Sequence, residues 1–105
     1  MAVLYINEYA RLGRERYAGT GNNIQSPLEP AIASSTVAIG GGSLQSPIFN
    51  PDTTLVMLHT DAICSIQFGV DPAASTQTFR LPANATQFYA VEPGKNMRVA
   101  VITNT

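Results

Sequence analysis

The sequence predicts an all-β protein, an antiparallel β-sandwich or small jelly roll, and two observations carry that prediction. Short apolar runs rich in β-branched and aromatic residues recur at roughly 8–12-residue spacing, with turn residues between them. No stretch keeps an apolar helical period over the length of a typical helix. A chain of 105 residues corresponds to one compact unit. We expect the sandwich domain to occupy residues 32–105 and an N-terminal arm and loop to occupy residues 1–31.

The most informative stretch is Thr53–Gly69, which holds the apolar runs Leu55–His59 and Ile63–Phe68. Each run is short for a helix, and a polar step separates them, so we expect a strand pair joined by a tight connection. The first run carries apolar residues at both alternating sets of positions, whereas the second is apolar at one set. This pattern favours a sheet stacked on another sheet, with one side partly covered.

Turn residues bound each of the remaining expected strands. Three glycines end one strand, Pro47 confines another to a sheet edge, and Pro93 followed by Gly94 favours a type II turn before the last strand. We expect Phe79 and Leu81 to face inward. The strands expected after the arm, besides the central pair, are Ile32–Ile39, Leu44–Phe49, Thr78–Leu81, Gln87–Val91 and Met97–Ile102.

The first part of the chain allows two interpretations. Val3–Ile6 is a short β-prone run, Asn7–Tyr17 is a weak helix candidate interrupted by Gly13, and residues 18–31 are a loop rich in Gly, Asn and Pro. The segment is either a solvated mixed-charge stretch or an arm that orders against a neighbour, and deleting residues 1–17 is then expected to leave the sandwich folded. Because Tyr and Arg are enriched at interfaces, the partner-binding residues on the second interpretation are Tyr5, Glu8, Tyr9, Arg11, Arg14, Arg16 and Tyr17.

Charge is scarce in this chain. Charged residues make up 12% of it, and the formal net charge is −1. That balance gives no electrostatic footprint for nucleic acid or an anionic membrane, and no apolar run approaches the about 18 residues of a membrane span. The first residues lack the continuous apolar core of a secretory leader. Low charge instead predicts a surface that is polar and uncharged, or covered by partners.

Residues that could carry chemistry are few. His59 is the only histidine and Cys64 the only cysteine, and neither has a chelating partner at a suitable spacing. We expect a hydrogen-bonded or rim histidine and an inert buried thiol. The carboxylates are scattered through loops, and Gly19–Gly21 lacks the lysine and strand-to-helix context of a phosphate loop. The sequence therefore predicts no catalytic residue, no metal site and no cofactor.

One set of stretches covers the chain's start and most of it from Ser46 onward: Met1–Tyr9, Ser46–Asn50, Thr60–Gly69, Asp71-Pro72, Phe88–Gly94 and the final apolar strand. Together they resemble small head proteins of tailed bacteriophages. The resemblance implies a capsid decoration, or cement, protein that binds the outside of the assembled head. It implies a homo-oligomer, a dimer or trimer, that clamps adjacent subunits of the major capsid protein. Its location would be the virion exterior, after synthesis in the host cytoplasm.

Two other functions remain open from the residues alone. The first is a carbohydrate- or receptor-binding β-module of a viral fibre or adhesin, which needs a surface cluster of aromatic and polar side chains. The sequence offers no Trp and only scattered Tyr for such a cluster. The second is a jelly-roll metal enzyme, which usually draws on several histidines, and one histidine argues against it.

Overall fold

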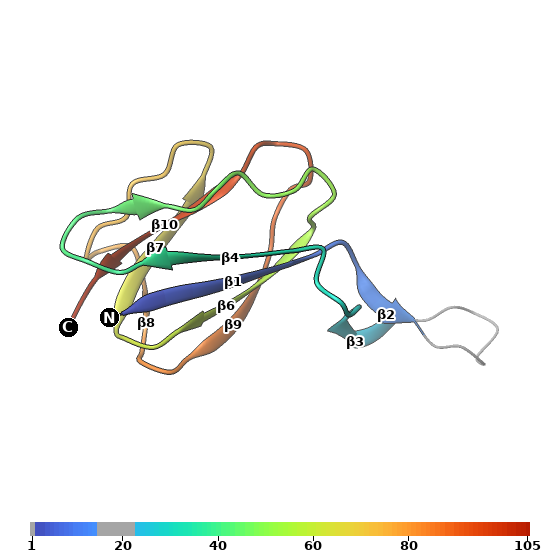
Figure 1. The fold of residues 1–105 in the computed structure, drawn as a ribbon, viewed down its shortest axis with the longest axis horizontal. Helices are drawn as coiled ribbons and strands as arrows, with labels where there is room; N and C mark the ends of the chain where they lie inside the picture. The colour runs from blue at the N-terminus through green and yellow to red at the C-terminus, as the bar shows by residue number, and fades with distance from the viewer. Residues whose placement is uncertain (1, 15–22) are drawn as a thin grey trace.

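The computed structural model describes residues 2–14 and 23–105, and over those residues it is all-β, with no helix (Figure 1). The predicted fold class is confirmed: two four-stranded antiparallel sheets form a sandwich, accompanied by a small hairpin. The strands are β1 (Val3–Tyr9), β2 (Leu12–Arg14), β3 (Asn23–Pro27), β4 (Ala33–Ala38), β5 (Leu44–Gln45), β6 (Leu55–Thr60), β7 (Cys64–Gly69), β8 (Phe79–Leu81), β9 (Thr86–Ala90) and β10 (Arg98–Thr103).

The first sheet has the strand order β4-β1-β6-β9, and the second has the order β5-β10-β7-β8. With the strands of a jelly roll lettered B to I, its sheets run B-I-D-G and C-H-E-F. Here β4 to β10 take the places of B to H in chain order, and β1 takes the place of I, the last strand. The chain therefore has the strand adjacency of a jelly roll in which the last strand, I, comes first in the sequence. The β2–β3 hairpin lies in the connection from this strand, β1, to β4, which takes the place of B.

Alternation along the strands builds the core between the sheets. The first sheet directs Leu4, Ile6, Val56 and Leu58 inward, and all are fully buried. The second sheet contributes buried aliphatic side chains and the free thiol of Cys64 to the same core. A fully buried aliphatic side chain stabilises a fold by about 1.5–3 kcal/mol, so the strands that supply these residues cannot be removed without loss of the fold.

The expectation that residues 1–31 form an arm outside the sandwich is wrong for β1. This strand pairs along its length with β4 on one side, Val3 opposite Ala38, and with β6 on the other, Leu4 opposite Thr60. An inner strand has both sets of backbone groups satisfied by neighbours, and removing it would separate β4 from β6. For the same reason, the prediction that the sandwich stays folded when residues 1–17 are deleted is wrong, since the deletion removes β1.

The prediction that the two apolar runs of Thr53–Gly69 pair with each other is also wrong. β6 lies in the first sheet between β1 and β9, and β7 lies in the second between β10 and β8. The polar step crosses from one sheet to the other and is fixed locally: Thr60 Oγ1 donates to the Ala62 carbonyl at 2.6 Å, and Val3 N–H donates to Asp61 Oδ1 at 2.8 Å. Both strands exist as predicted, but they meet face to face across the core.

The hairpin of β2 and β3 extends away from one end of the sandwich (Figure 1). It is the part of the predicted arm that does project, and Leu28 N–H donates to the Arg11 carbonyl at its base, at 2.9 Å.

In the C-terminal half, Gly94 has a φ of 73°, as the third position of the predicted type II turn requires. Leu81 faces the core as expected, whereas Phe79 is 62% exposed at the sandwich edge, which corrects its expected inward position.

Candidate partner-binding surface

The outer face of the first sheet is uncovered over most of its area. Cross-strand register places Tyr5 beside His59 and Met57 beside Phe88, all directed away from the core. Tyr5 is 46% exposed and Phe88 is 50% exposed. The centroids of the Tyr5 and His59 rings lie 6.2 Å apart. We call this surface the open face; its residues are Tyr5, Asn7, Ser34, Thr36, Leu55, Met57, His59, Thr86, Phe88 and Ala90.

The open face carries no acidic residue, lysine or arginine. Its polar groups are hydroxyl, amide and imidazole groups, several already hydrogen-bonded to each other: Ser34 Oγ donates to Asn7 Oδ1, and His59 Nδ1 is hydrogen-bonded to Thr86 Oγ1, both at 2.8 Å. Interface cores are depleted of charged residues and enriched in Tyr, Phe and Met. The composition of the open face is therefore that of a contact surface, not of a solvated sheet face.

The second sheet differs, because the loop of residues 70–78 covers part of its outer face. Alternation directs Ser65 and Ala100 outward there, yet both are fully buried. Asn104 Nδ2 holds the loop by donating to Ser65 Oγ at 2.7 Å and to the Thr76 carbonyl at 3.2 Å. Gln45 Nε2 adds a bond to Asp71 Oδ1 at 2.7 Å. We call residues 70–78 the covering loop.

A cleft of about 340 Å³ extends the open face toward the hairpin. Its sheet wall consists of Leu55 and Phe88, and its hairpin wall consists of Leu12, Ser26 and Pro27. The lining is mainly apolar and uncharged, so the cleft is suited to receive an apolar side chain of a partner.

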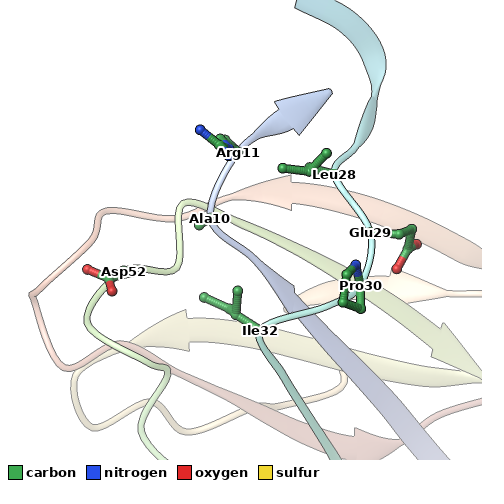
Figure 2. A pocket seen from close by; sticks show the side chains of 7 residues that line it. All are labelled: Ala10, Arg11, Leu28, Glu29, Pro30, Ile32 and Asp52. Atoms are coloured by element: carbon green, nitrogen blue, oxygen red, sulfur yellow. The ribbon is translucent and has the colours of Figure 1, made fainter. Parts of the chain in front are cut away.

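A second hollow, of about 480 Å³, lies at the base of the hairpin (Figure 2). The exposed side chains of Leu28 and Ile32 lie along it, and Arg11 and Asp52 stand at its rim. One cation, Arg11, and two carboxylates, Glu29 and Asp52, beside two aliphatic groups would allow a partner to combine apolar contact with charge pairing.

The predicted partner-binding residues fall into three groups. Tyr5 lies on the open face, and Arg11 lies exposed at the rim of the second hollow. Arg14 belongs to β2, and Arg16 and Tyr17 lie outside the described residues. Glu8 and Tyr9 are buried within the chain, 5% and 2% exposed, which removes both from the expected contact set.

The buried residues Glu8 and Tyr9 hold loops against the first sheet. Glu8 Oε1 accepts hydrogen bonds from the Asn50 N–H at 2.7 Å and from Thr53 Oγ1 at 2.8 Å. The Tyr9 hydroxyl donates to Glu29 Oε2 at 2.9 Å. Burial, and then the hydrogen bond and charge of Glu29, raise the pKa of Tyr9 above its ordinary value of 10.0.

The two residues singled out for possible chemistry have structural surroundings. His59 is a hydrogen-bonded residue at the surface of the sheet, as predicted. Cys64 is buried as predicted, and its thiol lies 3.5 Å from Thr60 Oγ1. Burial raises the pKa of the Cys64 thiol, the charge of Asp61 adds to this, and the Thr60 hydrogen bond opposes it. A buried thiol with a raised pKa holds little of the thiolate, which is the nucleophilic form.

Within residues 2–14 and 23–105, no group of three or more His, Cys, Asp or Glu side chains is placed to hold a metal ion. Over the same ranges, no helix has the length and apolar character to span a membrane. No protein-family model, curated protein or solved structure matches the chain.

Reasoning from the sequence missed Leu55, Met57 and Phe88 as surface residues of functional interest. The signal was present, because the run from Leu55 to His59 is apolar at both alternating sets of positions. One set had to face the core, and the other had to face either more protein or a partner. Which of these held depended on where the covering loop folds, and strand patterning does not specify that.

Proposed function

We propose that this protein is a capsid decoration protein of a tailed bacteriophage, binding the outer surface of the assembled head and stabilising contacts between major capsid subunits. The resemblance of its strand and turn segments to small phage head proteins supports this function. The observation that carries it is the open face, a sheet surface with exposed Tyr5 and Phe88, a half-buried Met57 and no charged side chain.

The physical demands of the role agree with this surface. A ligand that binds the assembled lattice and not free subunits stabilises the lattice by mass action. Displacing water from Tyr5, Met57 and Phe88 supplies a favourable contribution of about 25 cal/mol per Å² of apolar surface buried. The neutral hydroxyl and amide groups around them can pair with a partner without the cost of desolvating a charge.

The hairpin and its two hollows add reach to the flat sheet. The cleft between Leu12 and Phe88 continues the open face, and Arg11 lies beside the other hollow. A major capsid subunit at the open face and a neighbouring subunit at the hairpin would then be bridged by one molecule. As a homo-oligomer, the protein would multiply a modest contact through avidity.

The test is binding to heads of the encoding phage assembled without this protein, measured as protein bound per head after sedimentation. Wild-type protein is expected to saturate the heads, and the double variant Tyr5→Ala, Phe88→Ala to lose at least tenfold in affinity, because both anchors are truncated. Phe79→Ala is the matched control, since Phe79 is 62% exposed but lies outside the open face. It is expected to bind as the wild type does.

Absence of wild-type binding to intact heads would contradict the proposal. Selective binding of the isolated protein on a glycan array would instead favour the carbohydrate- or receptor-binding module, with Tyr5 and Phe88 as a stacking platform. Equal loss for Phe79→Ala and the double variant would place the contact elsewhere on the molecule.

A further inference from the structure

The two sheets have four edge strands, and the sequence protects them unequally. In the second sheet, β5 is two residues long with Pro47 close behind it, and β8 is three residues long and carries Arg80. Short length, proline and charge are the usual devices that keep an edge from pairing with another chain. The first sheet's edges, β4 and β9, are six and five residues long and have none of these devices.

β4 is the more open of these two edges. Its side chains are small and uncharged, and residues 30–51, which include it, contain no charged residue. β9 carries the bulky Phe88 and Tyr89, and the Tyr89 ring makes an edge contact with Phe79 of β8, with centroids 5.8 Å apart. That contact spans the side of the sandwich next to β9.

The hydrogen-bonding direction of β4 follows from its pairing with β1. Ile39 N–H donates to the Ala2 carbonyl at 3.0 Å, and Val37 stands opposite Leu4. Alternation in an antiparallel ladder therefore turns the backbone groups of Ser34, Thr36 and Ala38 away from β1, toward the free edge. Their side chains are small and exposed, so that among the described residues none of these side chains obstructs an incoming strand.

We propose that β4 pairs with β4 of a second copy of this chain, antiparallel about a twofold axis at Thr36. In this register Thr36 faces its own copy, and Ser34 of each copy faces Ala38 of the other. The facing pairs are small and neutral, so no like charges oppose each other, and a Thr–Thr pair is a favourable cross-strand neighbour. An isologous twofold contact closes on itself, which gives a dimer and not a filament.

Self-pairing would join the two first sheets into one continuous sheet of eight strands. The open faces of both copies would then lie on the same side, with the two Tyr5 rings flanking the axis, because Tyr5 stands opposite Thr36 in the β1–β4 register. This inference concerns the free protein and stands whether or not the protein binds heads.

The test is the mass of the purified protein by sedimentation over a hundredfold concentration range, without heads. We expect twice the 11.2 kDa chain mass for wild type. Thr36→Lys, which opposes two like charges at the axis, and Thr36→Pro, which removes an outward N–H that β1 does not use, are expected to give monomers. Far-UV circular dichroism checks that each variant is folded.

Two controls keep the result specific. Thr36→Val retains a neutral β-branched residue and is expected to stay dimeric, and Ala90→Pro makes the equivalent change on β9 and is expected to stay dimeric too. Amide exchange at Ser34, Thr36 and Ala38 is expected to be slow in wild type and at least tenfold faster in folded Thr36→Lys. A monomeric or trimeric wild type, or a dimer that Thr36→Lys leaves intact, would overturn the proposal.

Discussion

The two sheets of this protein share one core but differ in what lies on their outer faces. The second sheet is partly covered by residues 70–78, so that even Ser65 and Ala100, which point away from the core, are fully buried. The first sheet leaves Tyr5 and Phe88 about half exposed. One sheet thus buries part of its outer face within the chain, and the other retains an uncharged, partly apolar surface.

On the proposed function, this difference separates the part of the molecule that stabilises the fold from the part that binds a partner. Outward groups of the second sheet are hydrogen-bonded to the chain's own loop and belong to the fold. Outward groups of the first sheet contribute little to the fold and remain available to a partner. Substitutions on the two outer faces should therefore differ in kind, affecting the free energy of unfolding on one sheet and binding on the other.

The largest expected effect separates the two sides of β1. Ile6→Ala should lower the free energy of unfolding by about 2–5 kcal/mol, because it leaves a cavity in the core, where Ile6 is fully buried. Tyr5→Ala, at the preceding position but on the open face, should lower the free energy of unfolding by about 1 kcal/mol or less. Urea denaturation of both variants measures the difference. Equal costs would mean that the open face is packed in the free protein.

That contrast also shows how far the sequence predicts this structure. Alternation and turn residues predict the strands and the stacked sheets, since short-range chemistry determines both. Partner choice among strands is non-local: the position of β1 between β4 and β6, and the separation of β6 from β7, follow from closing a jelly roll. The run Val3–Ile6 is β-prone in either arrangement, and its sequence alone does not distinguish an inner strand from an arm.

The candidate surface was predictable in part. Tyr5 and Arg11 were expected to contact a partner from their residue types, and both are exposed. Tyr9 has the same side chain as Tyr5, and Glu8 was also expected to contact a partner, but both are buried. Their hydrogen-bond partners, Thr53 and Glu29, come from distant segments. Those contacts depend on loop paths, which local sequence patterns do not encode.

An intermediate effect is expected from uncovering the second sheet. Asn104→Ala removes the donor to Ser65 Oγ and to the covering loop, and it should cost about 1–2 kcal/mol because a buried hydroxyl loses its partner. Gln67→Ala, an exposed position on β7, is the matched control and should change stability by about 0.5 kcal/mol or less. Thermal denaturation compares the two, and increased exchange of the amides in residues 70–78 should accompany Asn104→Ala alone.

The smallest effect concerns Tyr9, whose side chain is buried at the end of β1 although it points away from the core. A pKa raised above 10.0 in the folded state means that the folded protein holds the Tyr9 proton to higher pH than the unfolded chain does. The resulting stability is complete below pH 10.0 and is lost as the pH rises through the folded pKa. Tyr9→Phe should therefore be about 0.5–1 kcal/mol less stable than the wild type at pH 7, and this difference in the free energy of unfolding should narrow above pH 10. Urea midpoints at both pH values measure it, and a constant gap would show that Tyr9 ionisation is not linked to folding.

The most direct test of the central claim is side-chain footprinting of the wild-type protein, free and bound to phage heads. Carbene labelling followed by mass spectrometry reports the exposure of individual side chains on any surface. We predict that labelling of Tyr5, Met57 and Phe88 falls at least fivefold on heads, while labelling of Phe79 and Val70 stays within experimental error. Unchanged labelling of the first three on saturated heads, or protection centred on Phe79 and Val70, would contradict the assignment of the open face as the binding surface.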